Sequence, residues 1–221
     1  MLRRGAGLLL AAALLGCAPL AHTPDGTAPA TAGEAAVTRL PAEAGGFRLA
    51  GPAQPDRTPG VREGMIARYE GRWGFATTYL FTREAAAVEE GPDSRQARQE
   101  LVTAAAASLI AATQNGAPRP AREAAVTFQQ GNAPALRCLL FERSLQSGLM
   151  TDFVCVTGVG GRLFKLRVTA RHTAENREEL VVAVGQLSTA LIAGAGSRPD
   201  GSPPRVPGLR YTALDTVPDA G

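Results

Sequence analysis

The sequence predicts an α+β domain in which an antiparallel β-sheet is covered by two main helices. Two observations carry this prediction. Segments with the two-residue alternation of β-strands fall into two groups, and one amphipathic helical pattern follows each group. Strands that follow one another without an intervening helix pair as antiparallel hairpins, and helices set apart from such a sheet define the α+β class.

The first group of strands is predicted over residues 47–51, 65–70 and 75–82. In the third of these strands, alternate positions share one face of the sheet and are mostly aromatic: Phe75, Thr77, Tyr79 and Phe81. Because aromatic side chains gain most from burial, we expect this face to lie in the core.

Two helices are expected, each with one apolar stripe. The first lies between an N-cap at Asp93 or Ser94 and a stop at Asn115-Gly116, and its stripe is formed by Leu101, Ala105, Leu109 and Ala112. The second follows Thr173 as its cap, and its stripe is formed by Leu180, Val184, Leu187 and Leu191. Each stripe should lie on the sheet.

The second group contains four successive strands, over residues 124–130, 135–144, 151–157 and 162–170. Between the last two stands Gly158-Val159-Gly160-Gly161, which is glycine-rich like a phosphate-binding loop. A strand follows it, whereas a phosphate-binding loop leads into a helix, so we predict a hairpin turn.

The first seventeen residues have the order of an export signal, with Arg3 and Arg4 followed by an apolar stretch over residues 8–15. This stretch is shorter than the ~20 residues of a membrane-spanning helix. It ends in Leu14-Leu15-Gly16-Cys17, which resembles the lipobox of bacterial lipoproteins. The resemblance implies a cleaved signal peptide over residues 1–16, lipid on Cys17 and, since Ala18 follows, the periplasmic face of the outer membrane. The alternative is an ordinary secretory signal with an incidental cysteine.

The remaining chain is predicted to contain a flexible tether over residues 17–44, a single α+β domain over 45–194 and a disordered Pro/Gly-rich tail over 195–221. Removal of the signal peptide takes away two arginines and no acids, so the formal net charge falls from +3 to +1. A nearly neutral protein offers no electrostatic reason to expect a nucleic-acid partner.

With Cys17 assigned to lipid, Cys138 and Cys155 remain on neighbouring predicted strands. A turn centred on Gln146-Ser147 places them opposite each other, and a turn centred on Ser147-Gly148 makes them diagonal neighbours on the same face. We predict a structural disulfide, because an exported chain meets an oxidising compartment. The alternative is a pair of buried thiols.

Recognisable catalytic chemistry is absent from the sequence. Either hairpin register places Glu142 and Asp152 on opposite faces, which argues against a catalytic carboxylate pair. The sequence contains neither a zinc motif nor a serine-hydrolase motif, and its two histidines are His22 in the tether and His172, which is expected to be solvated ahead of the second helix. We therefore expect no catalytic residue, metal or cofactor.

Trp73 and Tyr79 are the candidate binding residues. Trp73 lies in the loop Gly71-Arg72-Trp73-Gly74, where it is either exposed for binding or closes the end of the core. In the first case, a pocket around Trp73 and Tyr79 would bind a small ligand.

Three stretches resemble the PsbP-like α/β/α sandwich domains of bacterial envelope lipoproteins: Gly46-Phe47-Arg48-Leu49, Ala76-Thr77-Thr78-Tyr79-Leu80-Phe81 and Arg162-Leu163-Phe164-Lys165-Leu166-Arg167. The resemblance covers roughly residues 44–193. It implies a non-enzymatic protein-binding or assembly module with a protein partner in the envelope. The competing hypothesis is a small-ligand or cell-wall binding domain, including an enzyme of unfamiliar type.

The lipid assignment predicts that Cys17→Ser releases or mislocalises the protein, because the thiol that carries the diacylglycerol is lost. Fractionation of cells into membrane and soluble fractions measures this directly. Unchanged membrane retention of the Cys17→Ser variant would contradict the assignment.

Overall fold

The computed structural model describes residues 39–83, 87–130, 133–196 and 209–214. Cys17, the predicted signal peptide and most of the predicted tether lie outside these ranges. The described elements are β1 (Glu43–Ala44), β2 (Phe47–Leu49), β3 (Gln54–Pro55), β4 (Glu63–Gly71), β5 (Gly74–Thr82), α2 (Arg95–Gln114), β6 (Arg122–Gln130), β7 (Ala133–Leu145), β8 (Gly148–Val159), β9 (Arg162–His172), α3 (Arg177–Gly196) and β10 (Leu209–Leu214).

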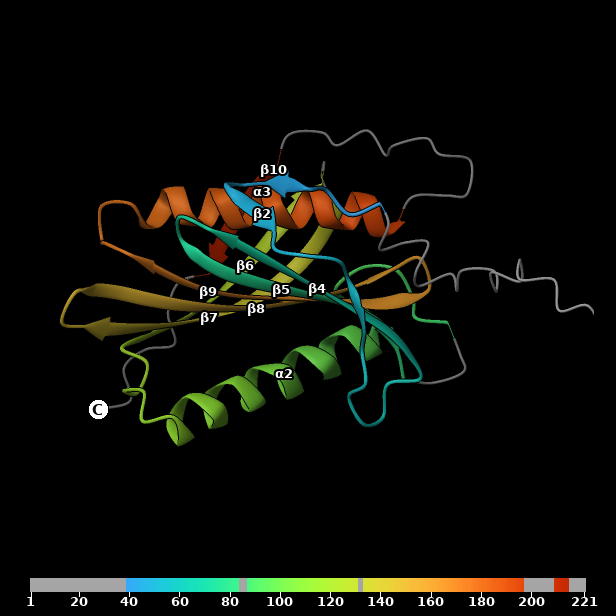
Figure 1. Cartoon of the computed structure of the whole chain (residues 1–221), viewed down its shortest axis with the longest axis horizontal. Helices are drawn as coiled ribbons and strands as arrows, with labels where there is room; N and C mark the ends of the chain where they lie inside the picture. Colours follow the sequence, from blue (N-terminus) through green and yellow to red (C-terminus); the bar gives the residue numbers. More distant parts are fainter. Residues whose placement is uncertain (1–38, 84–86, 131–132, 197–208, 215–221) are drawn as a thin grey trace, which may run out of the picture.

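The strands form one sheet in the order β1-β2-β4-β5-β9-β8-β7-β6-β10, with β3 paired to β4. Each of these pairings is antiparallel. Helix α3 covers one face of the sheet and α2 covers the other (Figure 1). The predicted α+β class, an antiparallel sheet with two helices, is therefore confirmed.

The sheet curves around α3. This helix contacts β1 at one edge of the sheet and β10 at the other, in addition to β8 and β9 beneath it. Figure 1 shows β2 and β10 on either side of α3. Helix α3 thus lies on the concave face of the sheet, between β1 near the start of the described chain and β10 at its end.

Helix α2 begins and ends where the sequence predicts. Ser94 is its N-cap and accepts a hydrogen bond from the Ala97 backbone amide through its side chain (3.1 Å), and Asn115 is its C-cap. A serine cap satisfies one of the free amides of the first turn. The inward side chains of α2 pack on sheet residues and on Val88 of the preceding loop. Together they form one hydrophobic cluster: Ala97, Leu101, Ala104, Ala105, Phe81, Val88, Phe141, Val154, Val156 and Leu163.

Helix α3 carries the predicted stripe, since Leu180, Val184, Leu187 and Leu191 are each 0 % exposed. Its predicted cap at Thr173 is wrong. Strand β9 continues to His172, and the carbonyl of Asn176 accepts the hydrogen bond from the Leu180 amide that opens the helix (3.1 Å).

The segment Arg177–Ala195 is long and apolar enough to cross a membrane by length and composition. In this structure its apolar stripe packs on the sheet, which is the position of a core helix.

The predicted disordered tail is wrong in part. Helix α3 extends to Gly196, and Leu209–Leu214 forms strand β10, which pairs with β6 from Leu209 opposite Gln130 to Leu214 opposite Ala125. The open edge of β6 offers a row of unpaired backbone groups that a short extended segment can satisfy. The composition of the tail gave no indication of that partner.

The aromatic face of β5 is only partly core. Phe81 is 1 % exposed, whereas Phe75 at the other end of the strand is 56 % exposed. Helix α2 lies mainly over β7 and β8 and leaves that end of β5 uncovered. The opposite face of β5, with Ala76, Thr78 and Leu80, is fully buried on the side of α3.

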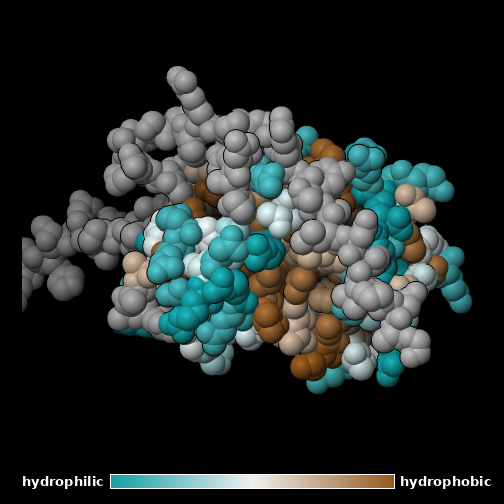
Figure 2. Space-filling view, turned by 180° about the vertical axis from the view of Figure 1, so that it is seen from behind, coloured by the Kyte–Doolittle hydropathy of each residue, from teal (hydrophilic) through white to brown (hydrophobic). Residues whose placement is uncertain are grey.

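The outer surface of α2 is also apolar. Val102 is 66 % exposed and Ile110 is 57 % exposed, and no charged residue occurs in this helix after Glu100. In the view from behind, apolar surface gathers in the lower half of the molecule, the half in which α2 lies in Figure 1 (Figure 2).

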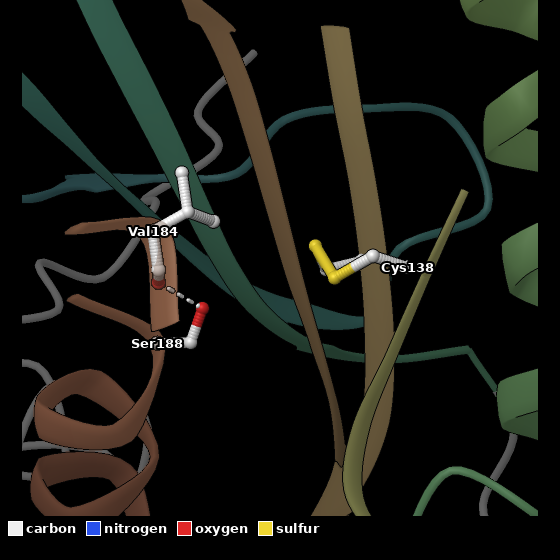
Figure 3. Close-up of a disulfide and its surroundings, with 4 residues drawn as sticks. Cys138, Val184 and Ser188 are labelled. Atoms are coloured by element: carbon white, nitrogen blue, oxygen red, sulfur yellow. Dashed lines mark hydrogen bonds between the residues drawn. A yellow bond between two sulfur atoms is a disulfide. The ribbon is translucent and has the colours of Figure 1, made fainter. Parts of the chain in front are cut away.

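The structure contains the predicted disulfide between Cys138 and Cys155. Leu145 pairs with Gly148, so the turn is centred on Gln146-Ser147 and the two cysteines lie directly opposite each other, with their Cα atoms 3.9 Å apart. Both cysteines are 0 % exposed. Their sulfur atoms lie on the face of the sheet toward α3, near Val184 and Ser188, while α2 lies on the far side (Figure 3).

The glycine-rich turn between β8 and β9 is a hairpin turn, as predicted. Gly160 and Gly161 join β8 to β9 with φ angles of 58° and 75°, the left-handed pair that a two-residue type I′ hairpin requires.

Replacing both Cys138 and Cys155 with alanine should lower the free energy of unfolding by about 3 kcal/mol, because the crosslink no longer restricts the unfolded chain. Urea unfolding of the oxidised wild type and of the double variant measures the difference. The reduced wild type is the matched control, and it should lose a similar amount. Two titratable thiols in unreduced, denatured protein would contradict the disulfide.

Candidate functional site

A cavity of about 440 Å³ lies between the first turns of α3 and strands β6, β7 and β8. We call it the α3 cleft. It is lined by Arg122, Ala124, Val126, Leu140, Glu142, Thr151, Phe153, Ala174, Glu175, Arg177, Glu178, Leu180 and Val181. Its size lies in the range of cavities that bind small molecules or side chains of a partner protein.

The floor of the α3 cleft is apolar. Ala124, Leu140 and Phe153 lie opposite one another on β6, β7 and β8 and form one row across the sheet. Val126 continues the floor along β6, directly opposite Cys138, so the disulfide lies beside the inner end of the cleft. Leu180 and Val181 line the cleft from α3.

A polar row crosses the sheet next to this floor, where Arg122 lies opposite Glu142 and Glu142 lies opposite Thr151. Arg177, the first residue of α3, donates two hydrogen bonds to the Glu142 carboxylate, one from Nε and one from Nη2, each 2.8 Å long. The hydrogen bond to Glu142 raises the pKa of Arg177. This bidentate pair attaches the start of α3 to the sheet.

His172 lies behind the polar row and is buried, so the expectation of a solvated histidine is wrong. The Nδ1 atom lies 2.8 Å from the carbonyl oxygen of Thr173, and the Nε2 atom lies 2.8 Å from the Thr151 hydroxyl. Because a carbonyl only accepts, Nδ1 donates to Thr173, and in the neutral ring Nε2 then accepts from the Thr151 hydroxyl. Strand β9 runs two residues beyond its predicted end, and its alternation turns the His172 side chain inward together with Ala170.

The mouth of the α3 cleft has a different charge on each wall. Arg122, on the β6 wall, has no carboxylate within 4.0 Å among the residues that the structure describes, because both oxygens of its cross-strand neighbour Glu142 are bound to Arg177. Glu175 and Glu178 stand on the α3 wall. A hydrogen bond from the Thr173 side chain lowers the pKa of Glu175, so this exposed carboxylate is ionised at neutral pH.

A second ionic cluster lies on the opposite face of the sheet, under α2. The buried Glu100 accepts hydrogen bonds from Lys165 Nζ (2.8 Å) and Arg83 Nε (3.1 Å). The Lys165 ammonium also lies 4.7 Å from the ring centroid of Tyr79. The neighbouring cavity measures about 210 Å³. Tyr79 and Lys165 therefore help to hold α2 on the sheet.

The structure does not bring the predicted binding residues together. Trp73 is 6 % exposed and belongs to the core cluster under α3, whereas Tyr79 packs against the cluster under α2. Of the two readings for Trp73, closure of the core is confirmed. Gly71 pairs with Gly74, so Trp73 lies in the turn between β4 and β5, outside the strand alternation that positions Tyr79.

The sequence does not group the cleft residues, because they come from three strands, a helix and the segment before that helix. One signal was present in the sequence. The hairpin register that pairs Cys138 with Cys155 also places Glu142 opposite Thr151, and it puts Asp152 on the other face, as predicted.

Thr151 and His172 have part of the geometry of a nucleophile and its base, but the carboxylate is misplaced for a catalytic triad. In a triad the carboxylate holds Nδ1. Here Nδ1 is bound to a carbonyl, and Glu142 lies 3.6 Å from Nε2 while Arg177 occupies its oxygens.

Comparison with known proteins finds no family model, curated protein or solved structure that matches this chain. Within the described ranges, no group of three or more histidine, cysteine, aspartate and glutamate side chains is placed to hold a metal ion. The candidate site therefore rests on its own geometry.

Glu142→Gln and Arg177→Gln should each lower the free energy of unfolding by about 1 to 2 kcal/mol, because each removes a charge-assisted pair whose carboxylate is largely buried. The double variant should lose less than the sum of the two, since both changes remove the same interaction. Urea unfolding measures all three. Glu175→Gln, which alters an exposed carboxylate, is the matched control, and strict additivity of the two changes would contradict the pairing.

Proposed function

We propose that this chain is a non-enzymatic binding module with the PsbP-like α/β/α sandwich architecture, anchored by lipid on Cys17 to the periplasmic face of the bacterial outer membrane. It binds a protein partner of the envelope through the α3 cleft. The observation that carries this proposal is the cleft itself, an apolar floor with charged groups of both signs at its mouth. Such a surface suits an apolar side chain of a partner with polar groups around it.

Rigid support around the cleft favours binding. The disulfide joins β7 to β8 next to Val126, and the Glu142–Arg177 pair holds the start of α3 above the sheet. Thr151 is kept in one orientation by His172. A site whose walls are already in place loses less conformational entropy when its ligand binds.

The proposed anchor limits where the partner can be. A flexible tether of the length that separates Cys17 from the first described strand extends typically ~25 to 30 Å. The domain would therefore reach only partners that lie close to the membrane surface. An assembly or adaptor role toward neighbouring envelope proteins fits this reach.

The volume of the α3 cleft favours a second candidate function, the binding of a small ligand such as a cell-wall fragment. About 440 Å³ suffices for a small molecule, and donor and acceptor groups converge at one end of the cavity. This site replaces the one first expected around Trp73 and Tyr79, which lie on different sides of the sheet.

Ala124→Trp should fill the floor of the α3 cleft and reduce partner capture by about tenfold or more, because a buried central contact is lost. The measurement is in-cell crosslinking of the lipidated full chain, followed by purification and quantification of the crosslinked proteins. Ala106→Trp, on the exposed side of α2, is the matched control and should capture partners as the wild type does.

Equal capture by the two tryptophan variants, both with their disulfide formed, would overturn the proposed protein-binding role of the cleft. If capture is absent but the small-molecule fraction of the envelope raises the melting temperature of the wild type and not of Ala124→Trp, the second candidate is correct.

A further inference from the structure

We infer that the α3 cleft recognises a short extended polypeptide segment in which an apolar residue is flanked by an acidic residue on one side and a basic residue on the other. This inference rests on the proposed function and names the chemistry of the partner. Its basis is the distribution of ionic groups around the cleft, which divides into a neutralised centre and two oppositely charged walls.

The centre of the polar row is already neutral. Both oxygens of Glu142 accept from Arg177, and the Thr151 hydroxyl is bound to His172. A charged group that entered at this point would have to displace an existing pair. The centre of the cleft therefore favours an apolar group, in agreement with the row of Ala124, Leu140 and Phe153 beside it.

The walls supply the ionic selectivity. Arg122 presents its guanidinium from β6 without an ion pair to any residue in the described ranges. A planar guanidinium recognises carboxylates through paired hydrogen bonds. On the α3 wall, the ionised and exposed Glu175 offers its carboxylate to a basic group of the ligand.

The separation of the two walls favours a polypeptide over a single zwitterionic head group. A helix packed on a sheet has its axis roughly 10 Å from the sheet, and Arg122 and Glu175 come from these two layers. Acidic and basic side chains a few residues apart span such a distance. The part of β6 that lines the cleft, from Arg122 to Val126, is about 13 Å long, which is the length of four residues of an extended segment.

Synthetic peptides test the inference on the full lipidated chain in detergent. Three N-acetylated and C-amidated probes share the apolar centre Leu-Val-Leu: one carries Lys before and Asp after it, one carries Gln and Asn at these places, and one carries Lys at both. Isothermal titration calorimetry measures their affinities for the wild type, Arg122→Glu, Ala124→Trp and Arg119→Glu. Arg119 is exposed on the loop before β6 and does not line the cleft, so Arg119→Glu is the charge-matched control.

The Lys/Asp probe should bind the wild type at least about tenfold more tightly than the Gln/Asn probe, because two ion pairs form at the walls. Arg122→Glu should reverse the order of the Lys/Asp and Lys/Lys probes, whereas Arg119→Glu should leave it unchanged. Ala124→Trp should weaken all three probes.

Equal affinity for the charged and uncharged probes would overturn the charge pattern while leaving the proposed binding role of the cleft intact, provided Ala124→Trp still abolishes partner capture. The peptide inference would be overturned if none of the peptides bound the protein. It would also be overturned if the protein bound phosphatidylethanolamine vesicles but none of the peptides. Peptide binding that Ala124→Trp does not weaken would overturn the location of the site as well.

Discussion

The two-residue turn at Gln146 and Ser147 sets the register of β7 against β8, and this register decides which side chains meet each helix. It places Cys138 against Cys155 on the side of α3, where they form the disulfide. It also aligns Glu142 with Thr151 on that side, and Phe141 with Asp152 on the side of α2. A slip by one residue would exchange the two faces of the strand and break both sets of contacts. The turn brings the two cysteines together, and the disulfide that they form then keeps β7 and β8 in this register.

Buried ionic groups attach each helix to its own face of the sheet. Arg177 binds Glu142 under α3, Lys165 and Arg83 bind Glu100 of α2, and the fully buried Arg143 joins Asp152 to the carbonyl of Pro118 ahead of β6. Burying charges costs desolvation free energy, so such pairs add less net stability than their distances suggest. They do penalise any packing in which one partner is left unpaired. Each helix therefore packs in the orientation that pairs its own charged residue, Arg177 of α3 with Glu142 and Glu100 of α2 with Lys165 and Arg83.

Local signals in the sequence predicted the elements whose causes are local. Ser94 and Asn115 mark the ends of α2, the stripe from Leu180 to Leu191 marks the buried side of α3, and the glycines at 160 and 161 mark a hairpin. Strand β10 escaped prediction because its stability comes from β6, some eighty residues earlier in the chain. The sequence left Trp73 either exposed or buried, because the burial of a loop residue depends on which distant segments pack against it. The alternation of apolar residues in strands gives no information on these segments. The cleft joins residues from β6, β7, β8 and α3, so it was foreseeable only after the strand registers and the path of α3 were known together.

The pairing of β10 with β6 has a consequence for the order in which the chain folds. Strand β6 has two neighbours, β7, which follows it directly in the sequence, and β10, so one edge of β6 stays unpaired until Leu209–Leu214 reaches the sheet. During that interval β6 presents its free backbone groups to any other extended chain, which is the usual starting point for misassembly between sheets. Strand β10 thus protects the edge of β6 from pairing with other chains. The time that β10 takes to reach β6 sets how long this edge is open to them.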